Sequence, residues 1–144
     1  MKDQSQLLLE NQLCFPIYAT SRMITRLYQP LLDVIDLTYP QYLVMLVMWE
    51  QDHLSIGQLG NKLFLNTNTL TPLIKKMEQK GLILKQRSTL DERTVNVSLT
   101  DSGRQLKQKA LDIPEKLAST SNIPISELNE FRNTMWKMLN FLEK

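Results

Sequence analysis

Apolar residues in this chain recur mainly at the three- and four-residue spacing of amphipathic helices. The first stripe consists of Leu13, Ile17, Ile24, Leu27 and Leu31. It predicts a long helix that begins near Asn11 and ends at Pro30 or soon after. Because a proline inside a helix lacks one hydrogen bond and clashes with the preceding turn, Pro16 predicts a bend or an irregular first turn around Cys14.

Two capping boxes mark the starts of the next helices. Thr38 and Gln41 open a segment that is almost wholly apolar, which predicts a buried helix. Ser55 and Gln58 open a shorter helix that runs through Lys62. Trp49 and Trp136 are predicted to lie in the core, and His53 in a polar surface turn.

Residues 66–80 predict a short helix with two unlike faces. Its apolar stripe is Leu70, Leu73, Ile74 and Met77. Asn66 is a good N-cap and Gly81 stops the helix. The opposite face carries Thr67, Asn68, Thr69, Thr71, Lys75 and Lys76. Two short helices joined by a few residues form a helix-turn-helix, in which Thr and Asn reach base edges and Lys neutralises phosphate. A solvated surface helix is the alternative for this segment in isolation.

Two short runs, residues 82–87 and 94–99, follow this helix, and the second alternates with a period of two, as a strand does. A polar turn joins them, and a hairpin directly after a helix-turn-helix is a wing. Arg93 in the turn is predicted to enter a narrow minor groove, which attracts arginine, and Asp91 to hold its guanidinium in place. A solvated turn residue is the alternative for Arg93.

The C-terminal part predicts two more helices. Thr100 is predicted to cap the first, which reaches about Ser119 and is bent or interrupted at Pro114, and Ser126 to cap the second. The last apolar stripe is Leu128, Phe131, Met135, Leu139 and Leu142. Long striped helices at both ends of a small domain predict a helical dimer interface. Folding back onto the same subunit is the alternative.

These elements predict a mainly α fold with a small β-hairpin wing. The 144 residues fit one domain. Residues 1–37 and 101–144 would form a helical dimerisation region, and residues 38–100 a winged helix-turn-helix DNA-binding region.

Charge is unevenly placed along the chain, whose net charge is +2. Residues 75–93 hold six basic and three acidic side chains, whereas residues 1–65 hold four and six. A local positive segment on a nearly neutral chain indicates a localised anionic partner, here double-stranded DNA. No apolar run is long enough to cross a membrane and no signal peptide is recognisable, so we expect a cytoplasmic protein.

Little in the sequence favours an enzyme. It shows no nucleophile–base pair, no glycine-rich phosphate loop and no usefully spaced carboxylate pair, and we predict no cofactor. One cysteine with one histidine argues against a structural zinc site. By default the lone Cys14 would be an inert buried thiol, but the positive end of a helix dipole near Cys14 favours a thiolate.

Several motifs resemble the MarR family of winged-helix repressors. Asp91-x-Arg93 followed by Leu99-Thr100 is similar to the family's wing signature, and the order of elements is similar over nearly the whole chain. Further motifs resemble the one-cysteine organic-hydroperoxide sensors of the OhrR type, namely residues 11–15, Tyr28, residues 39–42, residues 70–72 (Leu-Thr-Pro, hence Pro72) and residues 91–93.

The resemblance implies that Cys14 is a peroxide-reactive thiol to which tyrosine hydroxyls of a partner subunit donate hydrogen bonds. These roles fall on Tyr28 and Tyr39, with Tyr18 as a further neighbour. The function implied is a homodimeric repressor that releases a pseudo-palindromic operator when an organic hydroperoxide oxidises Cys14, with a low-molecular-weight thiol as a further partner. One alternative is a repressor of the same fold that is released by a small phenolic ligand, with Cys14 structural. Another is a thiol peroxidase, which leaves the basic helix and wing unexplained.

Overall fold

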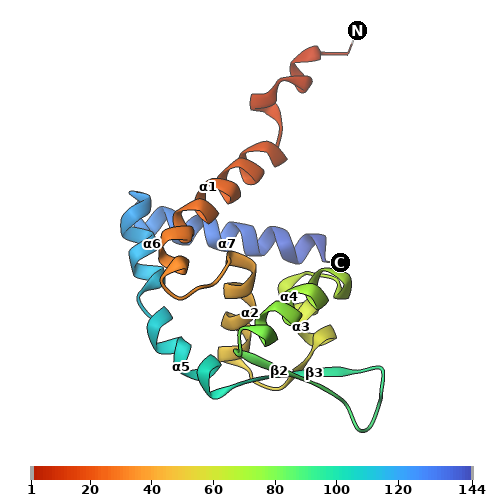
Figure 1. Ribbon diagram of the computed structural model, residues 1–144. Coiled ribbons are helices and arrows are strands. Elements are labelled where there is room, and N and C mark those ends of the chain that lie inside the picture. The colour runs from red at the N-terminus through yellow and green to blue at the C-terminus, as the bar shows by residue number, and fades with distance from the viewer. Residues whose placement is uncertain (1, 144) are drawn as a thin grey trace. The chain divides into compact units, whose positions relative to one another are not determined.

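The computed structural model describes residues 2–143 and divides the chain into two compact units. One unit combines the chain up to Leu31 with the chain from Asp112 onwards, and the other is Leu32–Leu111. The fold is mostly helical with one small antiparallel sheet, as the sequence predicted (Figure 1). Within residues 2–143, no helix combines the length and the apolar character needed to span a membrane.

The first unit begins with two short 3-10 turns, η1 (Gln4–Leu7) and η2 (Leu9–Asn11), which precede α1 (Cys14–Asp33). Pro16 is the third residue of α1, where a backbone N–H has no intrahelical partner to lose. The irregular backbone predicted around Cys14 therefore lies just before it. Pro30 lies inside α1, which ends three residues later.

The C-terminal helical segment is interrupted where Pro114 predicted. It forms α5 (Asp101–Ala110) and α6 (Ile113–Ser121), with Pro114 in the first turn of α6. The last helix, α7 (Ile125–Leu142), follows Pro124, so Ser126 lies inside it and makes no capping hydrogen bond. The predicted Ser126 cap was wrong, because the extended backbone of Pro124 already delivers the chain into the helix.

The predicted core position of Trp136 was also wrong. Trp136 lies on α7, none of whose described side chains is buried, and 52% of its surface is exposed in the single chain. Trp49 is half-buried, and its indole Nε1 donates a hydrogen bond to the Gly103 carbonyl at 2.9 Å. His53 lies on the surface, as predicted, with 74% of its side chain exposed.

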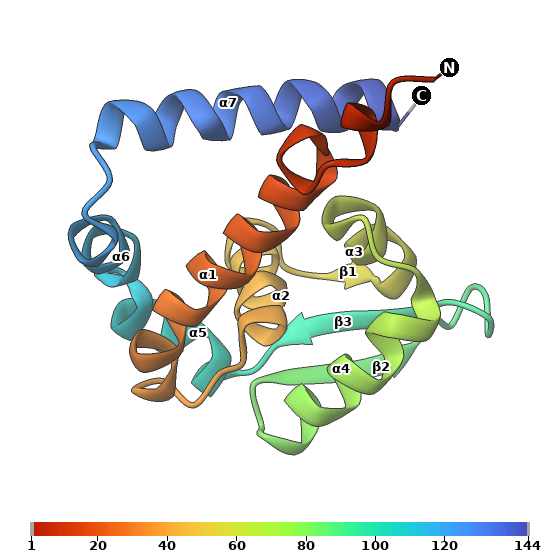
Figure 2. The ribbon, with the colours of Figure 1, turned by 90° about the horizontal axis from the view of Figure 1, so that it is seen from above.

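The second unit contains the helix-turn-helix and the wing (Figure 2). Its helices are α2 (Tyr39–Glu50), α3 (Ile56–Leu63), α4 (Thr67–Gln79) and α5; its strands are β1 (Leu54–Ser55), β2 (Ile83–Arg87) and β3 (Val95–Leu99). Both capping boxes are formed as predicted, at Thr38 and at Ser55. The antiparallel sheet has the order β1-β3-β2.

One core holds α4 against the sheet and the other helices of this unit. Its most deeply buried side chains are Leu32, Val44, Met45, Met48, Leu54, Leu59, Leu70, Ile74, Met77, Ile83 and Val97. Fully burying an aliphatic side chain of this size stabilises a fold by roughly 1.5–3 kcal/mol. The three α4 side chains in this set therefore fix which face of α4 points outward.

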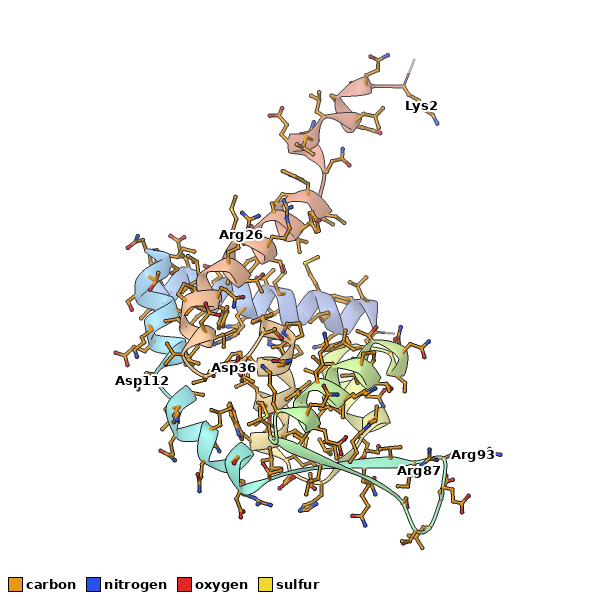
Figure 3. All side chains as sticks on the ribbon, in the orientation of Figure 1. Lys2, Arg26, Asp36, Arg87, Arg93 and Asp112 are labelled. Atoms are coloured by element: carbon orange, nitrogen blue, oxygen red, sulfur yellow. The ribbon has the colours of Figure 1, made fainter. Side chains whose placement is uncertain are left out.

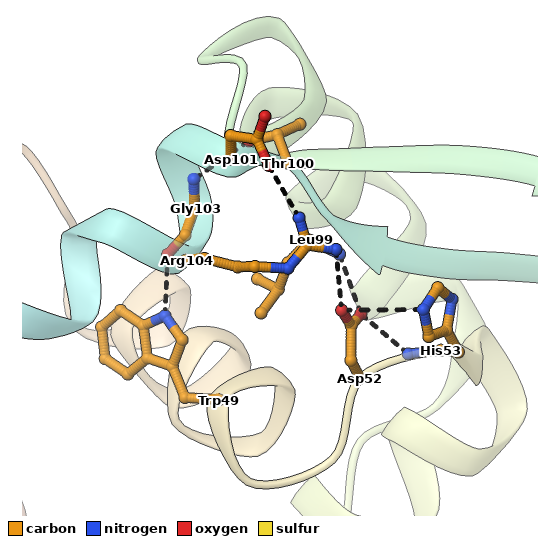
Figure 4. A network of polar contacts seen from close by, with 8 residues as sticks. All are labelled: Trp49, Asp52, His53, Leu99, Thr100, Asp101, Gly103 and Arg104. Carbon is orange, nitrogen blue, oxygen red and sulfur yellow. Dashed lines mark hydrogen bonds and ion pairs between the residues drawn. The ribbon is translucent and has the colours of Figure 1, made fainter.

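A carboxylate anchors the end of the wing strand (Figure 4). Asp52 Oδ1 accepts hydrogen bonds from the backbone N–H groups of Leu99 at 2.9 Å and His53 at 2.8 Å, and Oδ2 lies 3.4 Å from Arg104 Nη2. Burial alone would raise the pKa of Asp52, but these two amides and the charges of His53 and Arg104 lower it below its ordinary value. β3 and the start of α5 are thereby tied to the loop after α2.

Candidate nucleic-acid interface and thiol site

The outer face of α4 presents the side chains that the sequence predicted for DNA. Asn66 caps the helix, since its Oδ1 accepts a hydrogen bond from the Thr69 backbone N–H at 2.9 Å. All of the predicted residues on this helix are exposed: Thr67, Asn68, Thr69, Thr71, Pro72, Lys75 and Lys76. Burial of the opposite stripe fixes this polar and basic face toward solvent.

Two hydroxyls on this face already donate hydrogen bonds within the protein. Thr71 Oγ1 donates to the Thr67 carbonyl at 2.8 Å, and Thr69 Oγ1 donates to Asn66 Oδ1 at 3.0 Å. Each hydroxyl keeps acceptor lone pairs, which suit the amino groups of cytosine and adenine in the major groove. The side chains of Thr67 and Asn68 have no hydrogen-bond partner among the residues that the structure describes.

The wing turn is organised by Asp91, although not as predicted. Its Oδ1 accepts from the backbone N–H of Arg93 at 3.0 Å, and its Oδ2 from Thr94 Oγ1 at 3.4 Å. The prediction that Asp91 holds the Arg93 guanidinium was wrong, because in a tight turn an aspartate reaches the amide two residues on. Figure 3 shows Arg87 and Arg93 at the outer end of the wing.

A basic pocket of about 470 Å³ lies between α4 and the wing. Its lining consists of Ser55, Ile56, Gly57, Thr67, Thr71, Lys85, Arg87, Arg93, Thr94 and Val95. Three lining residues are basic and none is acidic, so the pocket suits an anion such as a phosphate ester. Glu78 positions Lys85, with Oε2 at 3.5 Å from Nζ, and Arg87 Nη1 donates to the Glu92 carbonyl at 3.2 Å.

Lys85 and Arg87 are absent from the predicted set of DNA-binding residues. A signal for them was present in the sequence, because residues two apart in a strand share one face. The alternation that identified the second wing strand, applied to β2, places Lys85 and Arg87 together.

Cys14 is the first residue of α1 and is exposed, so it is not a buried thiol within the single chain. Tyr18 lies one turn further on the same face, because residues four apart in a helix are neighbours. Tyr18 is 60% exposed, and the Arg22 guanidinium lies over its ring at 4.6 Å from the centroid. The helix therefore places a thiol, a phenol and a cation on successive turns.

The other two predicted tyrosines lie elsewhere. Tyr28 is 14 residues after Cys14 on α1, and at a rise of about 1.5 Å per residue it lies about 21 Å along the axis. It therefore cannot reach the thiol of its own chain. Tyr39 is the first residue of α2, in the second unit, and its ring centroid lies 6.5 Å from that of Tyr42. Burial raises the pKa of Tyr39, so its phenol remains a hydrogen-bond donor at neutral pH.

A helix-turn-helix with an exposed polar face, an antiparallel wing and a basic pocket between them defines a winged-helix DNA-binding regulator. The family model "Transcriptional regulator SarA/Rot" matches residues 26–110. The chain belongs to this family of MarR/SarA-type winged-helix transcriptional regulators.

Two relatives extend the similarity over nearly the whole chain. The organic hydroperoxide resistance transcriptional regulator of Bacillus subtilis (strain 168) is 46% identical over 136 residues, which cover 94% of this chain and 92% of that protein. The structure of reduced AbfR bound to DNA is 35% identical with a TM-score of 0.77, and the match covers 100% of both chains. AbfR comes from Staphylococcus epidermidis.

Two further structures of AbfR represent oxidised forms. Overoxidised AbfR bound to DNA has a TM-score of 0.74 at 35% identity, covering 96% of this chain and 99% of that one. Disulfide-formed AbfR has a TM-score of 0.64 at 34% identity, covering 94% and 96%.

Proposed function

We propose that this chain is a homodimeric repressor that binds a pseudo-palindromic DNA operator and releases it after an organic hydroperoxide oxidises Cys14. The position of Cys14 carries the proposal. It is an exposed thiol at the first residue of a helix, in a chain 46% identical to an organic hydroperoxide resistance regulator. The thiolate is the nucleophilic form of cysteine, and an exposed thiol is accessible to a peroxide.

The proposed reaction needs only the thiolate and the peroxide. The sulfur attacks the terminal oxygen of the hydroperoxide, an S–O bond forms and the O–O bond breaks. The alkoxide leaves with the electron pair of that bond and takes up a proton to become an alcohol. Cys14 becomes a sulfenic acid, so sulfur is oxidised by two electrons and the peroxide is reduced by two.

Apolar side chains beside the thiol favour an organic peroxide over hydrogen peroxide. Leu13 is 69% exposed and Phe15 is 41% exposed, one on each side of Cys14 in the sequence. An alkyl or aryl group that covers these side chains removes apolar surface from water, whereas hydrogen peroxide has no such group.

Exposed apolar side chains on α7 support a dimer. They are Ile125, Phe131, Trp136, Phe141 and Leu142. A second copy of the chain would cover such a surface through an isologous interface. The roles proposed for the tyrosines also need a second copy, since Tyr28 lies about 21 Å from Cys14 along its own helix. We assign the hydroxyls of Tyr28 and Tyr39 to the partner's thiol, and Tyr18 to the surroundings of Cys14 in its own chain.

The DNA-binding surface would combine α4 and the wing. Side chains proposed to contact DNA are Thr67, Asn68, Thr69, Thr71, Pro72, Lys75, Lys76, Lys85, Arg87 and Arg93, while Asp91 shapes the wing turn. The first residues of α4 would read base edges in the major groove, and Lys75 and Lys76 would contact phosphates. Arg93 would enter a narrow minor groove.

Oxidation in the presence of operator tests the redox proposal. The purified protein, bound to a duplex that it selects from a random-sequence library, is treated with one equivalent of cumene hydroperoxide in the presence of glutathione. We expect loss of DNA binding together with oxidation of Cys14, which passes through the sulfenic acid and ends as a mixed disulfide with glutathione. Cys14→Ser should bind the duplex and remain bound.

Three other results would contradict the proposal. Release by salicylate without any adduct would indicate a ligand-responsive repressor. Consumption of many equivalents of peroxide per protein would indicate a thiol peroxidase. Equal release of wild type and Cys14→Ser by peroxide would exclude Cys14 as the sensor.

A further inference from the structure

Leu90 is an unusual residue for the tip of a wing. Its surface is 97% exposed, the largest exposed fraction among the large apolar residues for which the structure gives one. The rest of the turn, residues 88–93, is polar or charged. A leucine held in water at the end of a hairpin contributes nothing to the core of its own chain.

The turn around Leu90 is ordered by hydrogen bonds. Ser88 Oγ accepts from the backbone N–H groups of Leu90 at 3.2 Å and Asp91 at 3.4 Å. The Ser88 N–H donates to the Thr94 carbonyl at 2.8 Å, and the Thr94 N–H to the Asp91 carbonyl at 3.0 Å. These bonds fix the backbone of the tip, so the Leu90 side chain projects from a preformed support.

Charge identifies the partner that this side chain fits. Arg87 and Arg93 lie at the same end of the wing (Figure 3), and both line the basic pocket that continues to α4. Cations on both sides of an apolar tip match a minor groove, which has phosphates along its rims and sugar carbons along its walls. Proteins that bind this groove commonly place an apolar wedge between base steps and partly unstack them.

We propose that Leu90 is a wedge that enters the operator's minor groove beside Arg93 and favours sequences that open easily there. The proposal rests on the DNA binding proposed above and assigns to Leu90 a contact based on shape and apolar area. Pyrimidine–purine steps such as TA are the most easily kinked, so they are the preferred sequence beneath the wing tip. This preference is indirect readout and needs no hydrogen bond to a base.

A salt series separates a wedge from a phosphate contact. Operator affinity of the full-length protein is measured between 50 and 200 mM salt, with a duplex selected by wild type from a random library. Leu90→Ala should bind at least about tenfold more weakly, because two wings per dimer each lose apolar contact area. Its salt slope should equal that of wild type, since no counterion is released by leucine. Leu90→Met should restore most of the affinity.

The matched control is Leu46→Ala, which truncates another exposed apolar residue, 41% exposed on α2 and outside both the wing and the predicted dimerisation region. It should bind like wild type. A second readout is 2-aminopurine fluorescence at the steps beneath the wing tip, which should rise when wild type binds and rise less with Leu90→Ala. Replacing the TA steps there by GC steps should weaken wild type more than Leu90→Ala.

Defined results would overturn the wedge. Leu90→Ala could bind with the same affinity as wild type, or its salt slope could be shallower, like that of Arg93→Ala. The 2-aminopurine fluorescence could also stay unchanged when wild type binds. A change in oligomeric state of Leu90→Ala without DNA would also overturn it, because Leu90 would then contact another protein copy. If wild type selects no duplex at all, the proposed DNA binding itself fails. If wild type binds and Leu90→Ala binds equally well, only the wedge fails.

Discussion

Removing one charge from the basic pocket should change the salt dependence of operator binding by a calculable amount. Lys85 is the most suitable position, because its charge lines the pocket and its backbone lies in the middle of β2. Lys85→Gln keeps the polar end of the side chain and deletes the charge. The pair with Glu78, 3.5 Å apart, is partly solvated, so its loss costs about 0–1 kcal/mol of stability.

The magnitude follows from counterion release. Each phosphate contact contributes about 0.9 to the slope of log affinity against log salt. A dimer has two such pockets, so Lys85→Gln should reduce the slope by about 1.8. A fourfold increase in salt, from 50 to 200 mM, would then weaken the variant about 12-fold less than wild type.

Fluorescence anisotropy with the selected duplex measures both slopes directly. Lys109→Gln is the matched control, because Lys109 is an exposed lysine on α5 that does not line the pocket. The control should keep the wild-type slope. If Lys85→Gln also keeps it, the pocket holds no phosphate and the wing sits on DNA in a different way from the one proposed.

Two further substitutions test the interface and the thiol site. Arg93→Ala should weaken operator binding at least about tenfold, as measured by anisotropy. Its free energy of unfolding, measured with denaturant, should stay within about 0.5 kcal/mol of wild type, because the exposed guanidinium has no protein partner among the described residues. Tyr28→Phe and Tyr39→Phe should bind operator like wild type but slow Cys14 oxidation several-fold in stopped flow, because each loses a hydroxyl proposed to stabilise the partner's thiolate. Equal oxidation rates would make these tyrosines ordinary packing residues.

Most of the fold could be predicted because local signals agreed with each other. Capping boxes at Thr38 and Ser55 and the N-cap at Asn66 placed three helix starts correctly. Each was followed by an apolar stripe that the fold buries. The period-two alternation of β3 identified the wing, and the stop at Gly81 fits its φ of 73°.

The errors occurred where local signals were too short or where they competed. β1 has only two residues, too few to show any period, and it forms because Leu54 pairs with Val97 far along the chain. Ser126 resembled a helix cap, but the proline two residues earlier already starts the helix. Asp91 has two possible partners on Arg93, which the sequence does not distinguish, and in the fold its carboxylate contacts the backbone amide.

The sequence predicted the residues of α4 that face outward but not the pocket that they share with the wing. A pocket depends on the distance between segments, and no periodicity encodes the approach of Lys85 and Arg87 to Thr67 and Thr71. The network of Asp52 was missed for the same reason. It joins residues about 50 positions apart, whose proximity results from tertiary packing.

The proposed switch requires that oxidation of Cys14 weakens DNA binding. A sulfenic acid adds one oxygen atom to a side chain that is exposed in the single chain, so it creates little steric conflict there. The sequence holds one cysteine, so no second thiol of the same chain can complete a disulfide.

A small thiol supplies the missing bulk. Its sulfur attacks the sulfenic sulfur, an S–S bond forms, the S–O bond breaks, and the oxygen leaves as water with the thiol proton. The resulting mixed disulfide places a large group beside α1, where the proposed dimer interface has to pack closely. Overpacking a well-fitted surface typically costs about 1–3 kcal/mol at each site, which corresponds to roughly a 5- to 150-fold loss of affinity per subunit.

Peroxide alone should therefore release the operator slowly or incompletely, and peroxide with a low-molecular-weight thiol should release it fully. An operator-release assay with and without glutathione, followed by intact mass under non-reducing conditions, measures both the signal and its chemistry. The released protein should carry one glutathione per chain, and a reductant should restore binding. A covalent dimer linked through the two Cys14 residues would instead require their Cα atoms to come within about 7 Å. Capture by a small thiol would be refuted if the released species were that covalent dimer. It would also be refuted if the operator were fully released with only the sulfenic acid present.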